Sequence, residues 1–257
     1  MKLERKRVIS IDVSIGPYES FIDQILKLAS KRKSSYICAA NVHMTVEAYK
    51  NKGFQQVVNN ANLVTPDGMP LVHALKLLYG IKQDRVAGMD LMPDLLKKAE
   101  AEGLPVFFLG STKEVLDMIL ERLSLEHPDL KIAGVYSPPF RPLTAKEHEG
   151  IENILNNSGA AIIFVSLGCP KQEMFMARMK GRVNAVMLGV GAAFPVYAGL
   201  RKRAPRWMQR LSLEWLYRLG QEPRRLFKRY AYTNTLFIYL LLKELLKKRR
   251  GYWRLKN

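Results

Sequence analysis

An unbroken apolar run, Val106-Phe107-Phe108-Leu109, leads through Gly110-Ser111-Thr112 directly into a helical pattern over Lys113–Glu126. A run of this kind, without polar alternation, is typical of a strand buried on both faces, as in a parallel sheet covered by helices. A second such run, Ile162-Ile163-Phe164-Val165, also precedes a helical pattern, at Lys171–Lys180. Repeated strand–helix units of this type predict a doubly wound α/β fold with right-handed crossovers and a mainly parallel, Rossmann-like sheet.

The same alternation extends over most of the chain. We expect further strands at Val8–Ile15, Tyr36–Asn41, Leu63–Thr65, Lys131–Tyr136, Ala160–Leu167 and Val183–Gly189. Helical patterns lie between them, among others at Tyr18–Lys33, Leu91–Glu102 and Thr144–Asn156. With 257 residues, 48% of them hydrophobic, the chain can bury one full core and a small appendage, and this composition excludes a disordered protein.

Positive charge is concentrated in the C-terminal part of the chain. The formal net charge is +18, and residues 201–257 carry 17 Lys and Arg against three acids, which places +14 of it in that segment. We therefore divide the chain into an α/β body, residues 1–199, and a basic, amphipathic helical appendage, residues 200–257. A near-neutral body with a basic appendage indicates a polyanionic partner, and membrane headgroups, nucleic acid and phosphorylated ligands all stay open at this point.

Nothing in the sequence directs the chain out of the cytoplasm or across a membrane. Only Cys38 and Cys169 occur, which is no disulfide framework and indicates a reducing compartment. The charged start, Met1–Arg7, lacks the apolar region of a secretory signal. No stretch approaches the ~20 apolar residues of a membrane span. We expect a cytoplasmic protein that is peripheral on the inner face of the cell membrane.

Two glycine-containing loops follow predicted strands, where parallel α/β sheets bind their ligands. Gly110 and Ser111 stand at the start of a helix, where free amides and the helix dipole favour a phosphate. An ordinary turn with a hydroxyl cap is the competing interpretation. Gly191 lies in Gly189-Val190-Gly191, where a backbone can approach a ligand closely. This is only a fragment of a dinucleotide fingerprint, so a Rossmann dehydrogenase is disfavoured.

A third loop is denser in polar groups. Gly168 is followed by Cys169 and Pro170 and then by Lys171, Gln172 and Glu173. A tight turn that leads into a cation, an amide and a carboxylate favours polar recognition of a ligand. A proline-initiated helix with solvated charges explains the same pattern equally well.

The segment Thr65-Pro66-Asp67-Gly68 places a carboxylate just beyond a predicted strand. A fixed, partly desolvated carboxylate is what a general base needs to deprotonate a hydroxyl, and we count Asp67 as catalytic and Thr65 as substrate-binding. A simple Asp-Gly turn is the alternative, and it is the commoner fate of such a dipeptide.

We expect no metal site. The chain has no D-x-D motif, and its four histidines show no metal-ligand spacing with each other or with the cysteines. The charge of a bound diphosphate must then be met by amides and by cations. The appendage supplies the cations Arg218, Arg224, Arg225, Lys228 and Arg229, for which a solvated or lipid-facing stripe is the competing interpretation.

A last helix is expected from about Thr235 to Arg250. It combines the apolar run Leu236–Leu242 with Lys and Arg, and Tyr252 and Trp253 follow. This pattern favours a helix that lies in the interface of an anionic membrane. Packing against the body and an RNA-binding tail are the alternatives.

Several of these segments together resemble the WecG/TagA/CpsF family of bacterial glycosyltransferases. The similarity is collinear from about Val8 to Tyr230. The segments that carry it are Asn41-Val42-His43, Thr65-Pro66-Asp67-Gly68, Arg85-Val86-Ala87-Gly88, Phe108-Leu109-Gly110, Gly168-Cys169-Pro170-Lys171-Gln172-Glu173, Arg203-Ala204-Pro205-Arg206-Trp207, Leu213-Glu214-Trp215-Leu216-Tyr217-Arg218-Leu219 and Glu222-Pro223-Arg224-Arg225-Leu226.

The resemblance implies an inverting, metal-independent transfer from a UDP-sugar to a polyprenyl-diphosphate-linked acceptor, in teichoic acid or other cell-surface polysaccharide synthesis. It makes Asp67 the base, and Asn41 and Gln172 part of the sugar and nucleotide pocket. It also implies that the appendage docks on the membrane and brings arginines over the site, here Arg218, Arg225 and Arg229. No cofactor beyond the donor is implied.

One departure concerns the donor sugar. Many relatives carry an acid soon after the glycine-rich strand, where this chain has Pro195. N-acetylmannosamine, its uronic acid and glucose therefore all stay open. A non-catalytic, membrane-associated nucleotide-binding protein is the alternative function. A nucleic-acid binder ranks last, because the appendage lacks a recognisable nucleic-acid-binding motif. We expect a monomer at the membrane or a homo-oligomer in solution.

Overall fold

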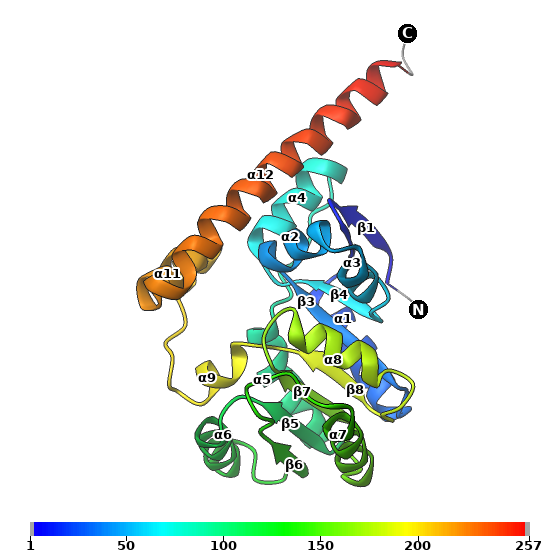
Figure 1. The fold of residues 1–257 in the computed structure, drawn as a ribbon, viewed down its shortest axis with the longest axis vertical. Coiled ribbons are helices and arrows are strands. Elements are labelled where there is room, and N and C mark those ends of the chain that lie inside the picture. The colour runs from blue at the N-terminus through cyan, green and yellow to red at the C-terminus, as the bar shows by residue number, and fades with distance from the viewer. Residues whose placement is uncertain (1–2, 255–257) are drawn as a thin grey trace.

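The computed structural model describes residues 3–254, with side chains described except at position 210 and over 249–254. Tyr252 and Trp253, expected at the membrane interface, have side chains outside the described part. A six-stranded parallel sheet with the order β4-β3-β8-β7-β5-β6 forms the centre (Figure 1). Its strands are β3 (Ser35–Ala40), β4 (Leu63–Pro66), β5 (Val106–Gly110), β6 (Ile132–Tyr136), β7 (Ile162–Ser166) and β8 (Val186–Gly189). The expected α/β fold with a doubly wound parallel sheet is confirmed.

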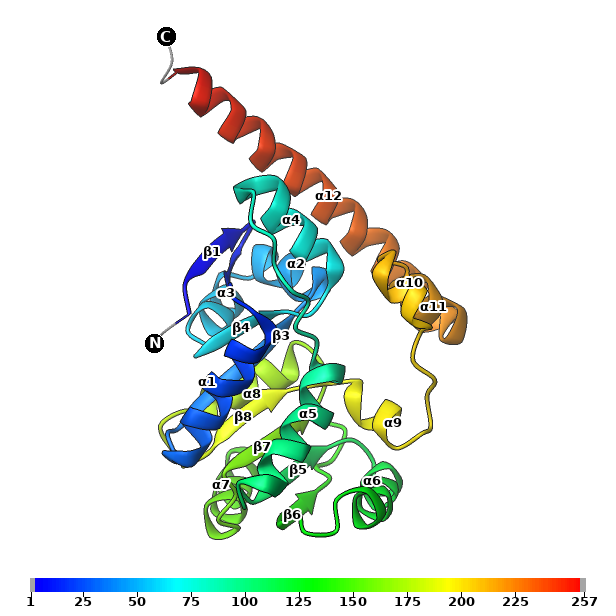
Figure 2. The ribbon, with the colours of Figure 1, turned by 180° about the vertical axis from the view of Figure 1, so that it is seen from behind.

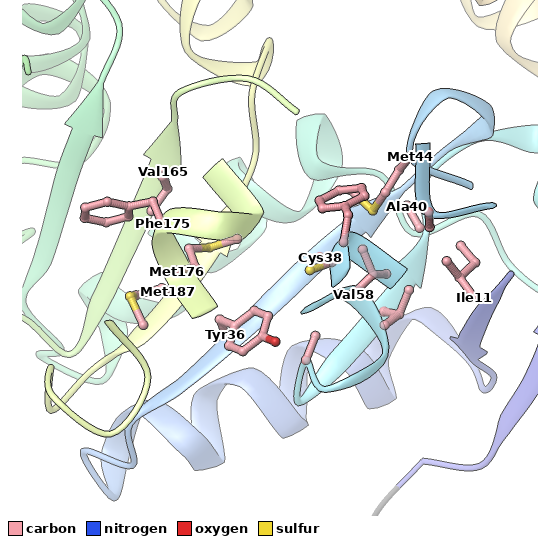
Figure 3. Packing of buried hydrophobic residues seen from close by; sticks show 14 of the residues in the cluster. Ile11, Tyr36, Cys38, Ala40, Met44, Val58, Val165, Phe175, Met176 and Met187 are labelled. Carbon is pink, nitrogen blue, oxygen red and sulfur yellow. The ribbon is translucent and has the colours of Figure 1, made fainter. Parts of the chain in front are cut away.

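Both faces of the sheet are covered by helices, which explains the unbroken apolar runs. Phe107 faces one apolar cluster and Phe108 the other, because successive side chains of a strand point to opposite faces. The first cluster (Figure 3) holds α2 (Val42–Lys50), α3 (Lys52–Asn59), α4 (Met69–Tyr79), α7 (Ala145–Asn157) and α8 (Lys171–Met179) against the sheet. The second holds α1 (Tyr18–Ser30), α5 (Gly88–Ala101), α6 (Lys113–Glu126) and α9 (Ala193–Tyr197).

The prediction of a single strand at Val8–Ile15 is wrong. The segment forms a separate antiparallel hairpin of β1 (Arg5–Val8) and β2 (Ile11–Ser14), and Ile9 turns the chain with φ = 58°. The turn could not be anticipated, because a β-branched residue is unusual at positive φ. The hairpin is attached to the sheet where the Val64 amide donates to Ser14 Oγ at 3.1 Å.

The appendage consists of α10 (Arg206–Arg210), α11 (Glu214–Gln221) and α12 (Pro223–Arg254). The sequence also predicts a helix start at Pro223, after Gly220, and this start is confirmed. The helix then continues through Thr235 without a break, so the separate last helix expected from about Thr235 is part of α12. It crosses the body over α2 and α4 and projects beyond it (Figures 1 and 2). Phe237 and Leu240 are buried, and Phe237 belongs to the first apolar cluster. One face of α12 therefore packs against the body, which was one of the alternatives to a helix in the membrane interface.

Polar contacts secure α12 further along its length. Glu244 accepts a hydrogen bond from the Ile9 amide at 3.3 Å. Lys248 donates to the Leu78 carbonyl at 2.8 Å, and its ammonium lies 3.6 Å from the centre of the Tyr79 ring. Within residues 3–254, no helix combines the length and the apolar content that crossing a bilayer requires.

Candidate active site

Every loop that the sequence singled out lies at the carboxyl edge of the sheet. Between β5 and β7 the sheet has a topological switch point, because α6 leaves β5 toward one face and α8 leaves β7 toward the other. Ligands of open α/β sheets bind in the crevice at such a point. The loops that begin at Gly110 and Gly168 flank this switch point, and β8 and β3 continue the edge toward β4.

The loops after β5, β7 and β8 are joined by hydrogen bonds. The Ser111 amide donates to the Ser166 carbonyl at 3.0 Å, and Ser166 Oγ donates to the Gly191 carbonyl at 2.8 Å. Gly110 has φ = 108°, and a Cβ there would lie 2.4 Å from the Ser166 oxygen, so only glycine allows this approach. Thr112 caps α6 by accepting from the Val115 amide. The first turn of α6 is thereby held at the crevice.

Asp67 lies at the other end of this edge, directly after β4. The amides of Asp67 and Gly68 both donate to the Ala40 carbonyl, at 2.9 and 3.3 Å, which holds the turn against the end of β3. Asn41 follows β3, and its Oδ1 accepts from the Met44 amide at 3.1 Å as the cap of α2. This contact leaves the Asn41 NH2 group to hydrogen-bond the Asp67 carboxylate. Two residues from neighbouring strands thus form one unit.

Burial raises the pKa of Asp67 to about 6. The positive charges of Arg85 and Arg218 lower its pKa, and the negative charge of Glu214 raises it. A carboxylate with a pKa near neutrality is largely ionised at pH 7, and it is basic enough to accept a proton from a reacting hydroxyl. The turn that the sequence predicted therefore carries a carboxylate tuned for general base chemistry.

Arg85 connects Asp67 to the appendage. Its Nε donates to the Asp67 carbonyl at 2.8 Å, and its Nη2 pairs with the Glu214 carboxylate of α11 at 2.8 Å. Arg203 forms a bidentate pair with Asp90, at 2.6 and 2.9 Å, and a small pocket lies beside it, lined also by Glu214 and Arg218. The appendage is thus docked where the catalytic candidate is, and its position affects the charge around Asp67.

The model of a family described as "Glycosyl transferase WecG/TagA/CpsF family" matches residues 6–251, which includes both the body and α12. The chain belongs to this family. The resemblance seen in the sequence is confirmed. A protein of Bacillus spizizenii is 32% identical over 225 residues, 87% of this chain and 86% of the relative. A protein of Bacillus subtilis is 35% identical over 211 residues, 80% of this chain and 79% of the relative. Both are named N-acetylglucosaminyldiphosphoundecaprenol N-acetyl-beta-D-mannosaminyltransferase.

The chain is accordingly a glycosyltransferase, and the non-catalytic alternative falls away. The three appendage arginines that were predicted to be catalytic, Arg218, Arg225 and Arg229, have different surroundings. Arg218 acts electrostatically on Asp67, whereas Arg229 acts on His43 in the first turn of α2 and helps burial to lower the pKa of that histidine. Arg225 has a mostly exposed side chain that pairs with Glu222, which also binds Arg201 at 2.6 Å. Of these three arginines, Arg218 is the one whose charge acts on Asp67.

The remaining sequence-predicted residues divide into exposed and buried ones. Gly168 and Lys171 are exposed at the edge of the sheet. Thr65 is fully buried and donates its hydroxyl to the Val86 carbonyl at 2.8 Å, so it supports the turn rather than facing a ligand. Gln172 and Glu173 are also buried, which rules out the solvated glutamate of the competing interpretation.

Two residues of the site were missed as such in the sequence. Arg85 and Glu214 each stand in a segment that resembles the family, but nothing in either segment indicates that the two side chains pair. The part of the chain that the structure describes contains no group of three or more His, Cys, Asp or Glu placed to hold a metal ion.

Proposed function

We propose that this glycosyltransferase moves N-acetylmannosamine, or a related hexose, from a UDP-sugar to a polyprenyl-diphosphate-linked sugar, with inversion and without a metal ion. The observation that carries the proposal is the buried Asp67 carboxylate at the carboxyl edge of the sheet, with its pKa raised to about 6 and with Arg85, Arg218 and Asn41 acting on it. The names of the two Bacillus relatives support the acceptor and the sugar.

The reaction follows from this placement. Asp67 accepts the proton of an acceptor hydroxyl, whose oxygen attacks the anomeric carbon of the donor. The bond from that carbon to the diphosphate breaks on the opposite face, so the configuration inverts and UDP leaves with the bonding electrons. Arg218, which acts electrostatically on Asp67, stabilises the negative charge that develops on the diphosphate.

Sugar transfer is the direct test. Purified protein is given a panel of UDP-sugars and a short prenyl-diphosphate-linked N-acetylglucosamine, with and without EDTA. We expect one UDP-sugar to be consumed, with UDP-N-acetylmannosamine first in order, at a rate that EDTA does not change. Loss of transfer in EDTA that Mg²⁺ restores would contradict the metal-independent mechanism, and consumption of no donor would contradict the proposed reaction.

The pH dependence of the reaction gives a second test. Because Asp67 must be ionised and its pKa is raised to about 6, kcat/KM is expected to fall about tenfold per pH unit below pH 6 and to level off above it. Glu173 also has a pKa raised by burial to about 6, so the profile is repeated with Glu173→Gln. We expect the acidic limb to persist in that variant. A rate that stays constant down to pH 5 would contradict the assignment of Asp67.

The outer face of α12 supports docking on an anionic membrane. Ile238, Leu242 and Leu246 follow one another at helical spacing and are 57%, 55% and 58% exposed. Lys243 and Lys247 are exposed next to them. Exposed aliphatic groups beside cations suit the boundary between acyl chains and anionic headgroups, where a polyprenyl-linked acceptor is held.

Two substitutions test this docking without disturbing the packed face. Ile238→Glu with Leu242→Glu places two acids on the exposed side, and we expect sedimentation with phosphatidylglycerol vesicles to weaken ~10-fold or more. The matched control is Leu125→Glu with Ile154→Glu, which changes two exposed aliphatic residues on α6 and α7. Equal sedimentation of both double variants would contradict membrane docking through α12.

A further inference from the structure

A buried amide–carboxyl pair stands at the start of α8. Gln172 is 4% exposed and Glu173 is fully buried. The Gln172 Nε2 group donates to Glu173 Oε1 at 2.7 Å. The second carboxylate oxygen, Glu173 Oε2, has no hydrogen-bond partner among the described residues. A carboxylate is rarely left in such a place without a task, because burial removes it from water at a cost in free energy.

The space that the Gln172 amide fills is created by glycines after β8. A Cβ at Gly189 would lie 2.8 Å from Gln172 Nε2, and one at Gly191 would lie 3.6 Å from Gln172 Oε1 and 4.0 Å from Nε2. The carbonyl oxygen is therefore the amide atom nearer to Gly191, in the loop that Ser166 binds. This oxygen has no hydrogen-bond partner among the described residues. A buried acceptor without a partner is unfavourable, because it has lost its hydrogen bonds to water, and a bound donor group would restore one.

We propose that Glu173 is a positioning residue that fixes the orientation of the Gln172 amide, so that Gln172 Oε1 faces the Gly191 loop and accepts a hydrogen bond from an N–H or O–H group of the UDP-sugar. This inference rests on the proposed function, because it concerns the donor of that reaction. The ionised Glu173 carboxylate holds the Gln172 amide in a single orientation. It only accepts hydrogen bonds, so it binds the NH2 end of the amide and leaves the oxygen for the ligand.

The nature of residue 173 therefore affects what the site recognises. A glutamine at position 173 can either donate or accept, so the Gln172 amide could then bind it through either end. The end that faces Gly191 would no longer be fixed as an acceptor. A site built to accept a hydrogen bond loses affinity when its acceptor is replaced by a donor, because two donors then face each other.

Calorimetric titration of the full chain with UDP and with the UDP-sugar that it uses tests the proposal. The variants are Glu173→Gln, which keeps the shape of the side chain, Gln172→Leu, and the two changes combined. We expect each single variant to weaken UDP-sugar binding about tenfold and the double variant to bind no more weakly than Gln172→Leu, because Glu173 acts through Gln172. In transfer assays the donor KM should rise while kcat stays within about threefold.

The matched control is Met176→Leu, which alters apolar packing beside Gly189 and leaves both residues of the polar pair unchanged. Met176 belongs to the first apolar cluster (Figure 3). We expect its donor affinity to equal that of the unchanged protein. Equal loss with UDP and UDP-sugar places the contact on the nucleotide, and loss with the UDP-sugar alone places it on the sugar. Unchanged affinity in Glu173→Gln, or losses that add in the double variant, would overturn the proposal. Binding is measured without an acceptor, so a failure of transfer alone bears on the proposed function and not on this pair.

Discussion

Replacing Asp67 with asparagine is expected to reduce sugar transfer ~10²–10⁴-fold, the range that a positioned general base contributes. The asparagine side chain has nearly the same shape, and the amides of positions 67 and 68 still donate to Ala40. It cannot take up a proton near neutral pH. We expect UDP binding, measured by calorimetry, to stay within about threefold of the unchanged protein, so that the loss appears in kcat. Transfer at a near-normal rate would remove Asp67 from its role as base.

The same variant makes a prediction about stability. Because the pKa of Asp67 is raised from 3.8 to about 6 on folding, the folded state holds this proton more tightly than the unfolded state. The ionised carboxylate therefore disfavours folding progressively as the pH rises from about 3.8 to about 6, and the full penalty holds above pH 6. Asp67→Asn should raise the unfolding temperature at pH 7.5, by ~2–4 °C for each kcal/mol of penalty removed, and this gain should shrink toward pH 4. A lower unfolding temperature at pH 7.5 would contradict the burial of a charged group.

Replacing Arg218 with glutamine is expected to lower kcat ~10²–10³-fold, as is typical when a group that stabilises developing negative charge is removed. Arg218 is an appendage arginine whose charge acts on Asp67, and it lines the pocket beside Arg203. Its positive charge also lowers the pKa of Asp67. The acidic limb of the pH profile should therefore move to higher pH in the variant, which a loss of diphosphate stabilisation alone would not produce.

Arg224→Gln is the matched control, because Arg224 is exposed and belongs to the same basic appendage. Both variants lose one positive charge, so both change the attraction to an anionic acceptor or membrane equally. With a short, water-soluble acceptor we expect Arg224→Gln to retain at least half of the normal kcat. Equal losses in the two variants would show that the total charge of the appendage, and not Arg218, supports the reaction.

The central elements of the fold could be predicted because their signals are local. The expected strand Val106–Gly110 and helix Lys113–Glu126 have the observed bounds. An apolar run ending in glycine, followed by a hydroxyl cap and a helical repeat, contains all of that information within a short stretch. The turn of the β1–β2 hairpin at Ile9 has no such local signal, and it was missed.

The candidate site divides in the same way. The turn at Asp67 could be located from the sequence, because Pro66 and Gly68 mark it and a strand precedes it. The roles of the neighbouring residues could not be predicted from the sequence. Thr65 near the end of β4 and Gln172 at the start of α8 both look like polar residues at the carboxyl edge of the sheet. In the structure Thr65 binds Val86 in the interior, whereas Gln172 pairs with Glu173 beside a glycine loop. Burial depends on which loops meet, and that depends on the order of the strands.

The sequence by itself determined the α/β class of this glycosyltransferase, the carboxylate at Asp67 and the basic, apolar character of α12, because each follows from residues that are neighbours in the chain. Only the tertiary structure decided that Arg85 joins Asp67 to Glu214 and that α12 packs one face on the body and leaves the other exposed. A pKa depends on charges and on water within a few ångströms. Those neighbours come from segments far apart in the chain, which are brought together when the parallel sheet forms and the appendage closes over its carboxyl edge.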